Sequence, residues 1–256
     1  MRVLRLLAVS WLFHVKQLSR SSFDCFLAIC WPIFFATVAF FMFRAGGDPE
    51  ALVYASLGAA VMGIWTATSV SAGSALQRER WHGTLELLVA APTHFSLILL
   101  PLAFATSAIG VYCMATTFLW GRVLFGIEIP IVHPLLFAIS IPATILSIGA
   151  LGFLIAVAFA RYRSSWALGS MTEYPIWLIC GFLVPLTLLP DWVRPISWAL
   201  APTWGMRAIR ESSTGGSPLP DVAMCLALGA TYIGIGIILT ETVLRAARQK
   251  ASLSLT

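Results

Sequence analysis

Six apolar runs, each close to the length needed to cross a lipid bilayer, constrain this chain more than any other feature of its sequence. About 20 helical residues span roughly 30 Å of hydrocarbon, and only the fifth run is short. In lipid a segment must satisfy its own backbone polar groups, so runs of this kind form helices. The sequence therefore predicts an all-α polytopic protein with six transmembrane helices, at residues 24–43, 52–75, 95–120, 134–159, 174–189 and 221–244.

The composition agrees with a membrane location. Apolar residues make up 59% of the chain and charged residues only 11%, whereas soluble domains carry about 25% charged residues. The net charge of +5 does not indicate nucleic acid, because the basic residues stand at the ends of apolar runs. That position is typical of membrane topology. We expect the lipid bilayer as a partner and no nucleic acid.

The distribution of arginine and lysine predicts the orientation. With six spans, both termini lie on one side, and that side holds eleven of the 16 basic residues against five on the other. Loops rich in arginine and lysine stay in the cytoplasm. We expect a multi-pass protein of the cell membrane with both termini cytoplasmic.

Residues 1–22 predict an amphipathic helix that lies in the headgroup plane. At 100° per residue, apolar and basic side chains fall on opposite faces. The apolar face holds Leu4, Leu7, Trp11, Val15 and Leu18, and the basic face holds Arg2, Arg5, Lys16 and Arg20. The predicted organisation is this helix, a transmembrane domain over residues 23–245 and a cytoplasmic tail over residues 246–256.

The loop between the second and third runs has a pattern of its own. Residues 77–92 read QRERWHGTLELLVAAP. As a helix, this segment separates polar from apolar residues, and Pro92 ends it. The polar face holds Glu79, His82, Gly83 and Glu86, and the apolar face holds Trp81, Leu85 and Leu88. The pattern predicts a short helix on the inner membrane surface that offers two carboxylates to a partner.

A second segment lies between the fifth and sixth runs. Residues 180–185 read CGFLVP, and residues 189–197 read LPDWVRPIS. Tryptophan prefers the depth of the headgroups, and three tryptophans follow in this region, Trp192, Trp198 and Trp204. We expect short helices at the outer interface, over about residues 190–212.

These two segments carry a family resemblance. The run RERWHGTLELLVAAP resembles the ERE-x-GTLE-x-L-x-x-x-P signature of type-2 ABC exporter permeases, and the outer segment is similar to that family's SG-x-x-x-P and LP-x-W arrangement. The resemblance implies a type V exporter fold with re-entrant helices between spans five and six. It also implies a coupling helix that meets an ATPase through Glu79, Arg80, Gly83, Thr84 and Glu86.

The resemblance also sets expectations for cofactors and cargo. ATP and Mg²⁺ would bind to a separate ABC ATPase, and a second permease subunit, identical or homologous, would complete the path. The few charges favour a hydrophobic or amphipathic substrate such as a drug, an antibiotic, a natural product or a lipid. Alternatives are export of a lipid-linked glycan or polysaccharide, a membrane enzyme, an assembly subunit or a channel.

Small residues crowd the second run and predict that it lies inside the bundle or at a subunit interface. Residues expected to line the path are Trp65, Trp177, Phe182 and Pro185.

The sequence holds no phosphate-binding loop and no catalytic or metal-ligating pattern, so we expect no enzyme and no metal site. Four carboxylates are expected at the ends of spans rather than at mid-bilayer, which argues against a proton-driven pump. These are Asp24, Glu173, Asp221 and Glu241.

Overall fold

The computed structural model describes residues 2–20, 22–46, 49–81, 83, 94–159 and 165–250. Within these residues every regular element is a helix. The longer helices are α1 (Arg2–Arg20), α2 (Ser22–Ala45), α3 (Pro49–Trp81), α5 (Ser96–Phe125), α6 (Pro134–Phe159), α7 (Ser165–Ile179) and α10 (Leu219–Lys250). Between α7 and α10 lie a 3₁₀ turn (Leu186–Leu188) and the short helices α8 (Val193–Trp198) and α9 (Ala201–Thr214).

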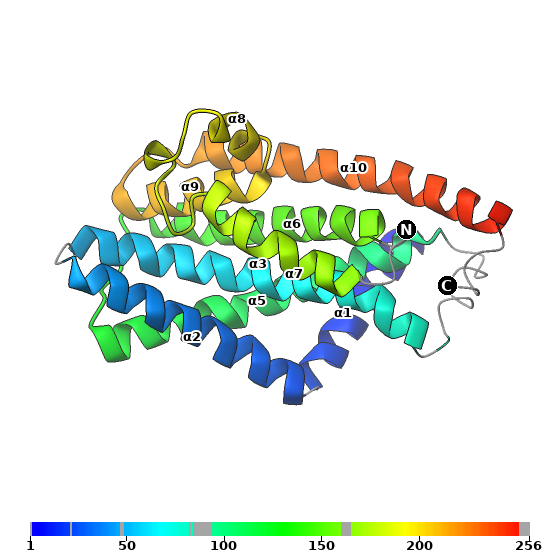
Figure 1. The fold of residues 1–256 in the computed structure, drawn as a ribbon, viewed down its shortest axis with the longest axis horizontal. Helices are drawn as coiled ribbons and strands as arrows, with labels where there is room; N and C mark the ends of the chain where they lie inside the picture. Colours follow the sequence, from blue (N-terminus) through cyan, green and yellow to red (C-terminus); the bar gives the residue numbers. More distant parts are fainter. Residues whose placement is uncertain are drawn as a thin grey trace.

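Helices α2, α3, α5, α6, α7 and α10 run alternately between the two ends of an elongated bundle (Figure 1). Four helical stretches of the described chain are long and apolar enough to cross a membrane. They are Glu50–Ser69, Ser96–Phe125, Pro134–Ala158 and Leu219–Thr242. A shorter apolar stretch, Ile33–Ala45, belongs to α2. The prediction of an all-α polytopic membrane protein is confirmed.

Helix α3 forms the centre of the bundle and packs against α2, α5, α6, α7 and α9. Every residue from Ala55 to Trp65 is buried. Small side chains permit this close packing. A Cβ added to Gly110 of α5 would lie 2.8 Å from the Cα of Ile64, which shows how closely the two backbones approach. The predicted place of the second span inside the bundle is therefore correct.

Most of the predicted spans agree with the helices. Helix α6 has the predicted bounds, and α2 and α5 differ from theirs by a few residues. Pro101 and Pro142 lie inside α5 and α6 without ending either helix. Helix α10 continues to Lys250, so residues 246–250, expected in a tail, are helical.

The fifth span is displaced from its prediction. Helix α7 begins at Ser165 and ends at Ile179, whereas the apolar run predicted residues 174–189. Hydropathy alone extends the span because the chain stays apolar past the end of the helix. Gly181 then turns the chain with a φ of 72°, a conformation that suits glycine, and Pro185 precedes the 3₁₀ turn. The correction moves Glu173 from the end of a span to the middle of a helix.

The predicted helix over residues 77–92 also needs correction at its start. Helix α3 continues without a break to Trp81, so Glu79 and Arg80 belong to α3. Gly83 has a φ of 67°, which a continuous α-helix does not contain. The longer α3 therefore replaces the first part of the expected separate helix. Thr84 and Glu86, like the rest of residues 84–93, lie outside the described residues.

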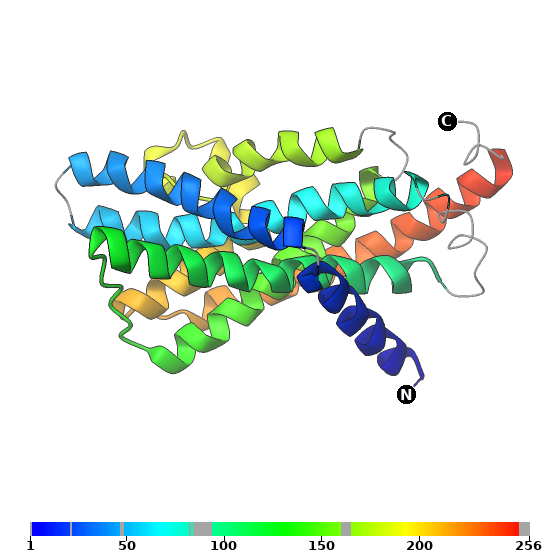
Figure 2. The same cartoon turned by 90° about the horizontal axis from the view of Figure 1, so that it is seen from below.

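Helix α1 takes a different direction from the bundle. Figure 2 shows that it leaves the side of the bundle obliquely, in the half where α10 ends. It packs against α5, with Leu18 buried and Arg5, Lys16 and Arg20 exposed. The predicted amphipathic helix is confirmed as a helix.

Candidate functional site

The end of α7 is held by side chains from two other helices. Arg210 of α9 donates hydrogen bonds from its guanidinium to the carbonyl oxygens of Gly181, at 2.8 Å, and Phe182, at 3.1 Å. The Tyr54 hydroxyl of α3 donates to the same Gly181 carbonyl at 2.8 Å. Gly181 and Phe182 follow the last residue of α7, so their carbonyls need partners outside the helix. Arg210 and Tyr54 supply those partners, and we call this arrangement the α7 clamp.

The α7 clamp is also tightly packed. The guanidinium carbon of Arg210 lies 3.2 Å from the centre of the Tyr54 ring, in a cation–π arrangement. Burial lowers the pKa of Arg210 to about 10, and the neighbouring Tyr54 opposes that shift, so the guanidinium stays charged at neutral pH. Gly58 completes the contact, because a Cβ there would lie 1.9 Å from the Phe182 carbonyl oxygen. Only glycine permits this approach.

Three of the four predicted path residues lie together, but as packed core. Trp65, Trp177 and Phe182 are 0%, 4% and 0% exposed and belong to one hydrophobic cluster. Pro185 is partly buried at the start of the 3₁₀ turn. Both indole Nε1 groups are buried without a hydrogen-bond partner among the described residues. Within one chain these side chains are part of the packed core, and their place along a substrate path stays a prediction.

Glu173 was expected at the end of a span, and the structure places it inside a helix. It lies in the middle of α7 and is 6% exposed. It accepts a hydrogen bond from the Thr66 hydroxyl of α3. A buried ionisable group in a membrane protein is a candidate for a functional role. The argument against proton coupling therefore loses the part that placed Glu173 at the end of a span.

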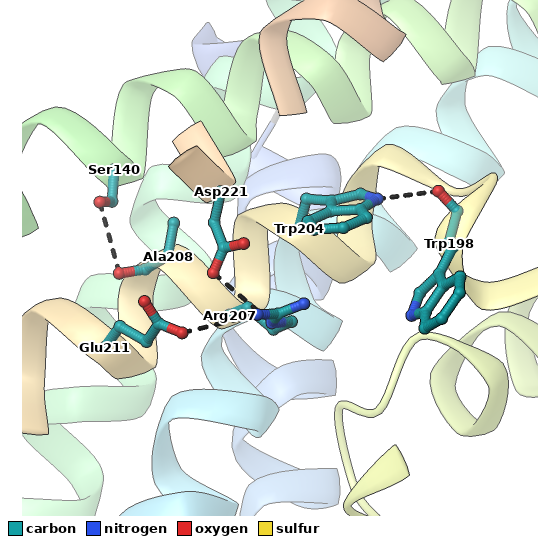
Figure 3. Close-up of polar contacts among 7 residues, drawn as sticks. All are labelled: Ser140, Trp198, Trp204, Arg207, Ala208, Glu211 and Asp221. Atoms are coloured by element: carbon teal, nitrogen blue, oxygen red, sulfur yellow. Dashed lines mark hydrogen bonds and ion pairs between the residues drawn. The ribbon is translucent and has the colours of Figure 1, made fainter. Parts of the chain in front are cut away.

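A charged cluster lies where α9 meets the start of α10 (Figure 3). The Arg207 guanidinium lies 3.6 Å from Glu211, one turn away, and 3.5 Å from Asp221 in the first turn of α10. The Asp221 side chain is 5% exposed, whereas that of Arg207 is 42% exposed. A carboxylate at a helix N-terminus is stabilised by the helix dipole. The cluster thus ties α9 to α10.

Aromatic side chains hold the turn between α8 and α9, next to this cluster. The Trp204 indole donates to the Trp198 carbonyl at 2.8 Å, and Arg207 lies 5.0 Å from the centre of the Trp204 ring (Figure 3). The Tyr232 hydroxyl of α10 accepts from the Ala201 amide at 3.0 Å and donates to the Ala199 carbonyl. These bonds fix the turn between α8 and α9. Both short helices fall in the region predicted for residues 190–212.

Sequence reasoning missed Tyr54, Arg210 and Glu173 as interacting residues. Their partners are 127, 29 and 107 residues away in the chain, so no local pattern joins them. One signal was present, because Arg210 stands among small and apolar residues on α9 and a buried cation needs acceptors. The described residues contain no cluster of His, Cys, Asp or Glu that would hold a metal ion.

Long apolar helices around a packed core, with short helices at one end, define a multi-pass α-helical membrane protein. A family model described as ABC-2 type transporter matches residues 5–213, and the chain belongs to that family. It is a permease subunit of an ABC transporter, and permeases of this family work with ABC ATPase subunits. No curated protein sequence matches the chain.

Proposed function

We propose that this chain is the membrane subunit of an exporter driven by a separate ABC ATPase. The ATPase acts on the end of α3, through Glu79 and Arg80, and on the segment that follows it, through Gly83, Thr84 and Glu86. ATP and Mg²⁺ bind to that partner. Both termini lie in the cytoplasm of the cell, and α8 and α9 face the exterior.

The continuity of α3 supports this proposal more than any other observation. The helix runs unbroken from the buried Trp65 to Trp81, at the bundle end near which α10 ends. At 1.5 Å per residue, this part is about 24 Å long. Because α3 packs against five other helices, a displacement at its end moves the centre of the bundle. A partner that pushes on the segment after α3 thereby changes the packing around the core.

The substrate path forms between two permease chains, identical or homologous. The interior of one chain is filled by side chains such as Trp65 and Phe182, whereas α2 and α7 expose large apolar side chains. They include Phe34, Val38, Phe41, Met171, Tyr174 and Leu178. Such a surface suits a hydrophobic or amphipathic substrate that enters from the bilayer.

Charge reversal of the coupling residues tests the proposal. We expect E86R and E79R to abolish co-purification with a co-expressed partner ABC ATPase and to abolish ATP-dependent uptake of substrate into inverted vesicles. The matched control is E128R, because Glu128 is exposed between α5 and α6 at the opposite end of the bundle. Intact association and transport in E86R and E79R would show that the ATPase does not act here.

A further inference from the structure

Glu173 has no role in the proposed contact with the ATPase, yet its surroundings are unusual for a carboxylate. Its carboxylate is buried in the bundle, and its partner is the neutral Thr66 hydroxyl. Among the side chains that the structure describes, no arginine or lysine pairs with it. A carboxylate in a low-dielectric interior is costly unless a proton or a cation compensates its charge. The position therefore suits a ligand that brings positive charge.

Aromatic residues of α2 and α7 lie close to this part of α7. Trp177 lies four residues after Glu173 on the same buried face of α7. Its ring meets Phe35 of α2 edge-on at 5.1 Å and Tyr174 at 5.2 Å. Tyr174 is 56% exposed, so these ring contacts begin at the surface of the chain.

We infer that Glu173, Phe35, Tyr174 and Trp177 form a binding site for lipophilic organic cations, and that such cations are the preferred cargo. The inference rests on the proposed export function and adds the class of substrate. Aromatic faces attract a desolvated cation, and a carboxylate in the same low-dielectric region adds a strong Coulomb attraction. The Thr66 hydroxyl orients the carboxylate. A proton relay fits less well, because it needs further ionisable groups in sequence.

The test compares two probes of equal shape and opposite charge, tetraphenylphosphonium and tetraphenylborate. Binding to the full chain in lipid nanodiscs is measured by equilibrium dialysis against empty nanodiscs, without nucleotide. We expect saturable binding of tetraphenylphosphonium and at least tenfold weaker binding of tetraphenylborate. E173Q keeps the size of the side chain and is expected to weaken tetraphenylphosphonium binding at least tenfold, while E173D keeps a clear preference for the cation.

Two further variants separate binding from folding. Y174A changes an exposed residue and is expected to weaken cation binding several-fold without lowering the unfolding temperature. E128Q removes an exposed carboxylate and is expected to leave binding unchanged. The inference is overturned by unchanged cation binding in both E173Q and Y174A, by equal affinity for the two probes, by absence of saturable binding, or by an equal loss in E128Q.

This measurement is independent of the ATPase. Charge-selective binding together with no ATPase partner would refute the exporter proposal and keep the cation site. An intact complex that transports substrate but binds the two probes equally would refute the cation site and keep the exporter.

Discussion

The Arg210 guanidinium lies 2.8 Å from the Gly181 carbonyl and joins α9 to the end of α7. A second nitrogen of the same group reaches the Phe182 carbonyl, so one side chain serves two carbonyls of the turn that follows α7. The shape of the guanidinium is essential here, because its donors form a planar fork and its face stacks on Tyr54. The α7 clamp therefore depends on arginine rather than on positive charge alone.

We predict that R210A lowers the free energy of unfolding by about 2–3 kcal/mol, since each lost bond involves a charged donor. R210K should lose most of the same stability, because one ammonium group does not reproduce the fork. Thermal unfolding of the purified chain in nanodiscs measures both. The control is R194A, whose partner Asp191 is 88% exposed, and which should change stability by less than about 1 kcal/mol. Equal effects of R210A and R194A would contradict the clamp.

Gly58 gives a second test of the same region. G58A places a Cβ 1.9 Å from the Phe182 carbonyl oxygen, so the backbone must shift. We expect a loss of about 1–3 kcal/mol, typical of an overpacked interior. The matched control is G234A in α10, where nothing lies within 4 Å of the added Cβ and a gain of about 0.5–1 kcal/mol is expected. A neutral G58A would show that α3 and the end of α7 pack less closely.

The cluster at the start of α10 predicts unequal effects for its two partners. R207A leaves the buried Asp221 without its cation and should cost about 2 kcal/mol, less than a fully buried pair because Arg207 is partly exposed. D221N removes the buried charge while Arg207 keeps Glu211, so the cost should be under about 1 kcal/mol. Unfolding of the single and double variants measures the difference. The reverse order would exclude a stabilising role for Arg207 at Asp221.

Cysteine labelling tests the proposed orientation. In a cysteine-free background, S217C should react with a membrane-impermeant maleimide on intact cells, because residue 217 is exposed in the proposed exterior region. Q17C, exposed on α1, should react only after permeabilisation. The opposite pattern would place the termini outside the cell and refute the orientation.

The sequence predicted those features that arise from local periodicity. The bounds of α6 were correct because an unbroken apolar run fills that helix. Hydropathy failed at α7, where the apolar chain continues past the turn at Gly181, and this error displaced Glu173 from its true place in the helix. The bonds from Thr66 to Glu173 and from Arg210 to Gly181 join distant segments, so only the packing of α3, α7 and α9 reveals them.

The Tyr232 hydroxyl has a consequence for any shortened form of the protein. Tyr232 and Asp221 both belong to α10, beyond the last residue of the family match at 213, yet they secure the turn between α8 and α9 and the Arg207 side chain. A fragment that ends at residue 213 would keep every matched residue and lose the α10 side chains that hold the turn between α8 and α9 in place.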